Sequence, residues 1–303
     1  MVVVTPAAAV RTGAVRAGAV RVAPALGRAA TLAVVLGGLW GLWEGYRWLW
    51  MTTGWTHPFA VSDITMPHIH QIVGQLFDPA QTNGPLLITI LWHSAVFTAK
   101  EAAAGFAIGA SIGFVLGVVM SQFRVLQRGL LPYVVASQTI PILAIAPMVV
   151  VGLGSLTIRG WTPTDWMRVA VIAAYLTFFP VTINTLRGLQ SADPRAIELM
   201  HSYAASRWSI LWKLRVPAAM PYLFSAFKIS ATASVVGAII GEAPSSIPSG
   251  LGGAIITFNQ YYSLEPSNLW ATNLVAALLG ITFFLAVVIV EKLVVRQAPE
   301  HVT

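Results

Sequence analysis

The sequence has no cysteine and few charged residues. The absence of cysteine among 303 residues excludes disulfide bonds and thiolate chemistry. Charged residues make up 10% of the chain against 56% hydrophobic residues, and the mean hydropathy is +0.74. Soluble globular domains carry about a quarter charged residues, so this composition excludes that class. We therefore expect an integral membrane protein.

Several site chemistries are also missing. The six histidines include only one close pair, His68 and His70, so we expect no metal site. No segment reads Gly-x-x-x-x-Gly-Lys-Ser/Thr, and the chain therefore lacks the loop that holds ATP phosphates. No span pairs an Asp with a His, so we expect no catalytic residues. The net charge of +7 belongs to basic residues beside apolar segments, a pattern that does not indicate nucleic-acid binding.

The apolar segments predict an all-α polytopic membrane protein with six transmembrane helices, because each is long enough to cross a hydrocarbon core of about 30 Å. The expected spans cover about 29–50, 98–121, 131–153, 167–186, 219–241 and 268–290. The expected regions are a basic tail (1–28), a first span with an external loop and an interfacial helix near 86–96 (29–97), a core (98–291) and a C-terminal tail (292–303). Lysine and arginine gather in both tails, at 124–128 and at 187–215, so the positive-inside rule places both termini and the segment 193–217 in the cytoplasm.

Two spans carry residues that bear on packing or on the pathway. Glycines recur every fourth residue from Gly105 to Gly117, and such a ladder permits close helix packing in lipid. The third expected span contains Pro132, Pro141 and Pro147, which break helical hydrogen bonds. A broken helix in a bilayer is tolerated where protein or a water-filled cavity satisfies the freed carbonyls, so this span is expected to line the pathway. Simple kinking for packing is the alternative.

Charged and aromatic residues near the last two spans supply the other pathway candidates. Lys228 falls in the middle of the fifth span, either as a pathway or subunit-interface cation or as a lysine paired with helix-end carbonyls. Glu242 begins an external stretch with a re-entrant pattern, and Tyr261 and Tyr262 follow it. We find no Asp or Glu in mid-membrane, because we place Glu101 near the outer surface.

The segment 193–217 mixes polar and apolar residues between two apolar spans. Asp193 followed by Pro194 indicates a helix start, and Ser206 can cap a second short helix that Pro217 ends. We expect two helices along the membrane surface, each with one apolar face.

This segment resembles the coupling (EAA) loop of binding-protein-dependent ABC importer permeases. The loop has the pattern Glu-Ala-Ala, three residues, Gly, nine residues, Ile, one residue, Leu-Pro. Glu198 matches the glutamate, and Ala204 stands where the family has glycine. Leu214 and Val216-Pro217 stand at the remaining positions, and Leu199 and Met200 replace the two alanines.

Other segments resemble the nitrate/sulfonate/taurine-type branch of these permeases. The stretch QTIPILAIAPMVVVGLG (Gln138–Gly154) is similar to the Pro-x-x-Ala-x-x-Pro third span of that branch. The resemblance extends from about Thr98 to Glu291. It also includes Asn184-Thr185, Gly188, Pro221, Lys228, Glu242 and Gly250-Leu251-Gly252.

The resemblance implies a type I ABC importer permease fold in a bacterial inner membrane. It implies two separate ATPase subunits that bind ATP and magnesium, a periplasmic or lipid-anchored substrate-binding protein, a second permease copy in a homodimer, and no cofactor on this chain. Residues implied to contact the ATPase or to shape the contact are Glu198, Tyr203, Ala204, Ser206, Arg207, Trp208 and Pro217. The alternative for Trp208 and Trp212 is anchoring at the lipid interface.

Two substrate classes stay open at this point. The branch suggests a nitrate-, sulfonate- or taurine-like anion, which Lys228 suits. The stretch GEAPSSIPSGLGGAIITFNQYY is closer to relatives of pyrimidine, thiamine-precursor or riboflavin uptake, where Tyr261 or Tyr262 could stack on the substrate. An ion-gradient-coupled secondary transporter is the alternative to an ATP-driven importer, and the expected lack of mid-membrane carboxylates disfavours it.

Overall fold

The computed structural model describes residues 19–55, 57, 60–81, 83–157, 160–243 and 247–295. Over these ranges the chain is helical, with one isolated β-bridge between Pro79 and Leu86 and no strand. It divides into two compact units, Met1–Ile69 and His70–Thr303. The expected tail as far as residue 18, and the C-terminal residues from Arg296 onward, lie outside the described residues.

The first unit contains α1 (Ala19–Thr53), a helix of 35 residues. At 1.5 Å per residue it is about 52 Å long, whereas the expected first span of 22 residues would be about 33 Å long. Aromatic residues gather near its C-terminal end, where the rings of Tyr46 and Trp50 stack with their centroids 4.1 Å apart.

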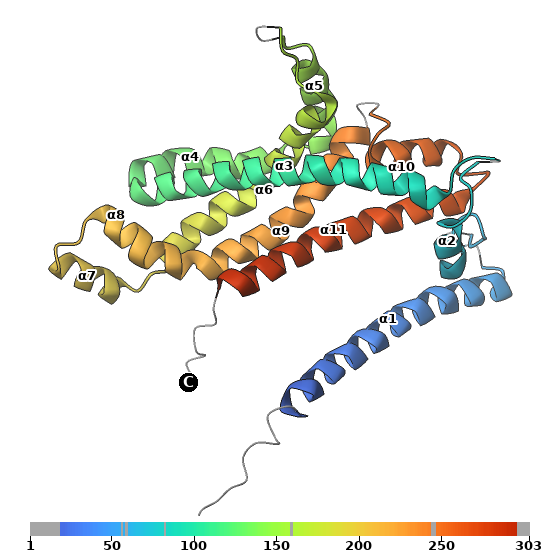
Figure 1. The fold of residues 1–303 in the computed structure, drawn as a ribbon, viewed down its shortest axis with the longest axis horizontal. Helices are drawn as coiled ribbons and strands as arrows, with labels where there is room; N and C mark the ends of the chain where they lie inside the picture. Colours follow the sequence, from blue (N-terminus) through green and yellow to red (C-terminus); the bar gives the residue numbers. More distant parts are fainter. Residues whose placement is uncertain are drawn as a thin grey trace, which may run out of the picture. The chain divides into compact units, whose positions relative to one another are not determined.

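The second unit is a helical bundle (Figure 1). Its helices are α2 (Ile69–Gln75, which begins at the boundary), α3 (Leu87–Gln122), α4 (Arg124–Ala136), α5 (Ile142–Gly154), α6 (Asp165–Gln190), α7 (Pro194–Ser202), α8 (Arg207–Ile210), α9 (Val216–Glu242), α10 (Leu251–Gln260) and α11 (Pro266–Val294). The short segments η1 (Ser137–Thr139) and η2 (Leu211–Arg215) join α4 to α5 and α8 to α9. Figure 1 shows α7, α8 and the C-terminal end of α11 at one end of the bundle, and α10 at the other.

Helix α6 lies at the centre, packed against α3 on one side and α9 on another. The glycine ladder of α3 makes the first contact close. A Cβ atom added at Gly105 would lie 2.3 Å from the Ala173 Cβ, and one added at Gly109 would lie 2.5 Å from the Ala174 carbonyl oxygen. A Cβ atom added at Gly237 of α9 would lie 2.8 Å from the Ala173 Cα. The predicted close packing at the ladder is confirmed, and its partner is α6.

The second expected span begins earlier than predicted. We placed an interfacial helix near 86–96 and a separate span from Thr98, but α3 runs unbroken through both. The split at this point is wrong, since no proline or glycine interrupts the segment from Leu87 to Ala104. The polar pair that prompted the split does not interrupt the helix: Glu101 is fully buried, and exposed Lys100 lies 4.2 Å from the ring centre of Trp166.

The third expected span is broken at one of its three prolines. Helix α4 with η1, and helix α5, meet at an angle of 98° around Ile140 and Pro141. Pro141 is the N-cap of α5, where its missing N–H removes no helical hydrogen bond. Pro132 and Pro147 lie inside α4 and α5 without ending them. In Figure 1, α5 stands away from the direction of α3 and α6.

By length and composition, four helices of the described residues are able to cross a membrane: Leu87–Gln122, Asp165–Gln190, Arg207–Glu242 and Pro266–Val294. The bent pair Arg124–Thr139 and Ile142–Gly154 makes a fifth if it crosses as one span. Helix α1 is not in this set, so the sixth span stays a prediction.

Candidate functional site

The two capping residues of the segment 193–217 act as predicted. The Asp193 side chain accepts a hydrogen bond from the Arg195 backbone N–H at 2.9 Å, and Pro194 occupies the first position of α7. The Ser206 hydroxyl oxygen accepts one from the Ser209 N–H at 3.2 Å, at the start of α8. Both bonds satisfy N-terminal amides that a helix cannot pair internally. Two helices therefore begin where the sequence predicts.

The turn between α7 and α8 has the geometry that glycine normally provides. Ala204 adopts a φ of +52°, and the Ala204 N–H donates to the His201 carbonyl at 2.9 Å. The Ala205 N–H donates to the Met200 carbonyl at 3.0 Å, which completes a Schellman motif. Ala204 is the position where the family pattern has glycine, so the tight turn is kept without it.

The second short helix does not stop at Pro217, contrary to our expectation. Helical structure continues from Arg207 through η2 and α9 to Glu242. The η2 segment is a π-helical turn in which the Val216 N–H bonds the Leu211 carbonyl, five residues back. A widened turn leaves room for the proline ring, which otherwise clashes with the carbonyl four residues before it. Pro217 lies in the first turn of α9.

The α7–α8 segment presents a polar and aromatic surface to its surroundings. Glu198 is exposed and makes no ion pair with any described residue. Tyr203 and Trp208 are 78% and 67% exposed, and Trp212 is 53% exposed. Large exposed apolar side chains beside an unpaired carboxylate indicate a contact surface for another molecule.

A buried polar cluster lies at the other end of the bundle, around Glu242. The Thr98 hydroxyl donates to one carboxylate oxygen at 2.6 Å, and the Gly252 N–H donates to the other at 2.6 Å. The Leu251 N–H donates to Thr98 at 2.9 Å. A carboxylate at a helix N-terminus is favoured by the unpaired amides and the helix dipole. Glu242 therefore fixes the start of α10 to α9 and α3.

The structure adds two features to the sequence prediction. Glu242, expected to begin an external stretch, is the last residue of α9, and both Glu242 and Glu101 are fully buried within the protein. Neither oxygen of Glu101 has a hydrogen-bond partner among the described residues, and its ionisable neighbours are Glu242, Asp165 and Lys100. The signal for Glu101 was present in the sequence, because it lies four residues before Gly105 and so on the same face as the glycine ladder. Two carboxyl groups buried inside the bundle thus weaken the argument that a lack of mid-membrane carboxylates disfavours an ion-coupled carrier.

Lys228 has a partner that the sequence did not reveal. Its Nζ atom lies 2.9 Å from one carboxylate oxygen of Glu291 on α11 and 3.1 Å from the other. Both side chains are about one quarter exposed. The lysine is paired with a carboxylate and not with helix-end carbonyls. It ties α9 to α11.

The remaining pathway candidates lie in different parts of the second unit. Pro141 lies at the α4–α5 break and Pro147 within α5. Tyr261 follows α10 and is 54% exposed, and Tyr262 is half-buried. The described contacts do not bring these tyrosines together with the prolines or with Lys228. Their role in a pathway stays a prediction.

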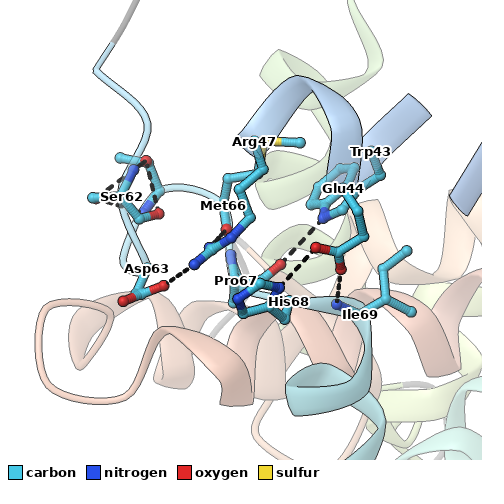
Figure 2. Close-up of polar contacts among 10 residues, drawn as sticks. Trp43, Glu44, Arg47, Ser62, Asp63, Met66, Pro67, His68 and Ile69 are labelled. Carbon is cyan, nitrogen blue, oxygen red and sulfur yellow. Dashed lines mark hydrogen bonds and ion pairs between the residues drawn. The ribbon is translucent and has the colours of Figure 1, made fainter. Parts of the chain in front are cut away.

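The first unit has its own group of polar contacts, at the C-terminal part of α1 (Figure 2). Buried Arg47 donates to the Met66 carbonyl and pairs with Asp63, and this hydrogen bond holds the pKa of Asp63 below its ordinary value. Glu44 lies 2.7 Å from the His68 ring nitrogen. The Trp43 ring N–H donates to the Pro67 carbonyl at 3.2 Å. Three residues of one helix turn thus fix the segment 63–68.

The family model for "Binding-protein-dependent transport system inner membrane component" matches residues 109–297, more than half of the chain. The chain belongs to this family. It is 31% identical over 190 residues to the formylaminopyrimidine transport permease protein ThiX of Halalkalibacterium halodurans, covering 61% of this chain and 71% of that one. It is 28% identical over 208 residues to the riboflavin transport system permease protein RibX of Chloroflexus aurantiacus, covering 68% and 73%.

A solved structure agrees on the fold. The crystal structure of an amino acid ABC transporter with histidines superposes with a TM-score of 0.54 at 15% identity, covering 68% of this chain and 95% of that chain. The chain is thus a multi-pass inner-membrane ABC importer permease, and the family is one of transporter subunits and not of enzymes.

Proposed function

We propose that this chain forms the membrane pathway of an importer whose energy comes from separate ATPase subunits. Family membership supports the importer, and the sequence has no phosphate-binding loop of its own. The observation that carries the proposal is the α7–α8 surface: a capped, tightly turned pair of helices that exposes Glu198, Tyr203 and Trp208. This surface is where we expect the ATPase to dock.

Each residue that the family resemblance places at the ATPase contact has its own role there. Glu198 offers a carboxylate to a basic or backbone donor of the ATPase, and Tyr203 and Trp208 offer apolar area, with Arg207 beside them. Ala204 and Ser206 set the turn that orients the two helices. Pro217 sets the widened turn through which α8 continues into α9.

The helical run from Arg207 to Glu242 suggests how docking is coupled to the pathway. Its 36 residues span about 54 Å, and α9 packs along the central helix α6. Glu242 at its far end holds the start of α10. When ATP closes the two ATPases, a displacement of α8 is carried along this run to α10, as in a rigid-body rocking mechanism. Release of the hydrolysis products reverses the movement.

We further propose a planar nitrogen heterocycle as the substrate class. ThiX and RibX are named for formylaminopyrimidine and riboflavin transport. Lys228, which favoured an anion, is already paired with Glu291. Exposed Tyr261 lies beyond α10, at the end of the bundle away from α7 and α8, where a substrate-binding protein would deliver the ligand. Tyr262, next in the chain, is the other aromatic group able to stack on it.

The proposed assembly is a homodimer of permeases on two ATPase subunits, with both chain termini and α7–α8 in the cytoplasm. The joint location of α7, α8 and the end of α11 supports this orientation. The periplasmic or lipid-anchored binding protein then meets the opposite end of the bundle.

The substitution Glu198→Lys tests the ATPase contact. We expect the variant to insert normally but to lose its ATPase during co-purification, because the charge at the contact is reversed. Glu265→Lys is the control, since Glu265 is also exposed but lies before α11 at the opposite end. Normal ATPase recovery with Glu198→Lys would contradict the contact. Substrate uptake without ATP, driven by an ion gradient, would favour the secondary transporter.

A further inference from the structure

We propose that a pocket at the coupling end of the bundle binds the headgroup of an anionic phospholipid. The pocket measures about 290 Å³ and lies between the last turn of α3 and the first turn of α8. Its lining residues are Val118, Val119, Gln122, Phe123, Arg207, Trp208 and Leu211. The proposal rests on the proposed orientation, which puts this end at the cytoplasmic surface. It shares Arg207 and Trp208 with the proposed ATPase contact, and the test below separates the two roles.

The lining combines an apolar wall with one cation and no acid. Val118, Val119 and fully buried Leu211 form the apolar part. Arg207 is exposed and makes no ion pair with any described residue. A guanidinium group matches the geometry of phosphate oxygens, which it contacts through two parallel N–H donors. The pocket therefore suits a ligand with a phosphate next to an apolar body.

An unpaired amide inside the pocket points to the same chemistry. The side-chain nitrogen of Gln122 is buried and has no hydrogen-bond partner among the described residues. A buried donor without an acceptor is costly, and rotation of the Gln122 side chain toward the pocket would let a phosphodiester oxygen accept its hydrogen bond. Gln122 and Phe123 also line an adjoining hollow with Arg124, which adds a second cation within reach of the headgroup.

The aromatic residues at the rim favour a lipid over a soluble anion. Trp208 is 67% and Phe123 is 55% exposed, and tryptophan is enriched at the depth of lipid headgroups. Basic pockets between transmembrane helices on the cytoplasmic side are where anionic headgroups bind. We therefore assign the ligand as a membrane phospholipid such as phosphatidylglycerol. Its acyl chains lie along the apolar surface at the end of α3.

The test compares bound lipids on the purified, full-length transporter by native mass spectrometry. The protein is given equal amounts of phosphatidylglycerol and phosphatidylcholine with the same acyl chains. We expect Arg207→Gln to lower the ratio of bound phosphatidylglycerol to phosphatidylcholine about fivefold, the typical effect of one basic residue near a membrane surface. Gln122→Leu removes the amide donor and should also lower the ratio. Arg195→Gln, at an exposed arginine of α7 that lines neither pocket, should leave it unchanged.

Trp208 offers a second readout. Brominated phosphatidylglycerol should quench the part of the fluorescence that Trp208→Phe removes, and brominated phosphatidylcholine should quench it less. An unchanged lipid ratio in Arg207→Gln overturns the proposal. Displacement of the lipid by millimolar inorganic phosphate assigns the pocket to a soluble anion and also overturns it. Loss of the ATPase from Arg207→Gln with unchanged lipid binding assigns Arg207 to the motor contact instead.

Discussion

Ala204 adopts a backbone conformation that an L-amino acid with a Cβ disfavours. At φ +52° the left-handed region costs about 1–2 kcal/mol for a residue with a Cβ atom. Two backbone hydrogen bonds of the Schellman motif hold the residue there. The strain is retained at the turn that orients the proposed coupling helices, where the family pattern has glycine. The chain thus preserves the shape of the turn at the expense of stability.

Replacement of this alanine by glycine should therefore stabilise the turn. Relief of the left-handed strain is partly offset by the greater freedom of glycine in the unfolded chain, so we expect Ala204→Gly to gain about 0.5–1 kcal/mol. Hydrogen exchange of the amides from Tyr203 to Ser206 measures the local effect, and thermal unfolding measures the global one. Ala205→Gly is the matched control, because Ala205 has no positive φ and should lose stability. Equal effects of the two substitutions would show that Ala204 is not strained.

Among the helices, α6 makes the contacts that define the bundle. It meets α3 across the glycine ladder and α9 across Gly237 and Gly241, so small residues on its two neighbours allow backbones to approach on both sides. Because hydrocarbon surrounds the bundle, van der Waals packing takes the place of the hydrophobic effect in holding these helices together. Loss of the close approach should therefore weaken the whole unit.

The substitution Gly109→Ala tests this packing. An added Cβ would lie 2.5 Å from the Ala174 carbonyl oxygen and 2.7 Å from the Thr177 Cβ, and the backbone atom cannot move aside without shifting α6. We expect a loss of about 2–3 kcal/mol, in the range that overpacking costs. The measurement is thermal or denaturant unfolding of the purified protein in detergent.

A control for this substitution exists within another helix. Gly152 of α5 has no atom within 4 Å of an added Cβ, so Gly152→Ala should be neutral or stabilising by up to about 1 kcal/mol through helix propensity. Similar destabilisation by both substitutions would mean that the loss comes from the helices themselves and not from the contact with α6.

For the molecule as a whole, local features were predictable from sequence and long-range pairings were not. The caps at Asp193 and Ser206 and the close packing at the glycine ladder each depend on residues within a few positions, and each is confirmed. Of the three prolines expected to break the third span, only Pro141 lies at a break. The Lys228–Glu291 pair joins residues 63 apart, and the Thr98–Glu242 bond joins residues 144 apart. Periodicity carries no information on such partners, because they are set by how helices pack.

The same distinction explains the two errors in helix boundaries. A polar residue such as Glu101 predicts a position at the surface, and Pro217 predicts the end of a helix. In the folded chain Glu101 is accommodated by burial beside Glu242, and Pro217 by a π-helical turn. The burial of Glu101 and the π-helical turn before Pro217 both depend on neighbouring helices and turns, which the identity of one residue does not reveal.

The orientation of the whole chain can be tested cleanly because the sequence contains no cysteine. Single cysteines at Ser202 and Ser263 report on opposite ends of the bundle, since both side chains are exposed, Ser202 is the last residue of α7 and Ser263 follows α10. We expect an impermeant maleimide to label Ser263→Cys in intact spheroplasts and Ser202→Cys only in inverted membrane vesicles. The cysteine-free parent is the blank in both preparations. Labelling of Ser202→Cys from outside would place the α7–α8 surface beyond the reach of any cytoplasmic ATPase, and the proposed coupling would then fail for a reason independent of Glu198.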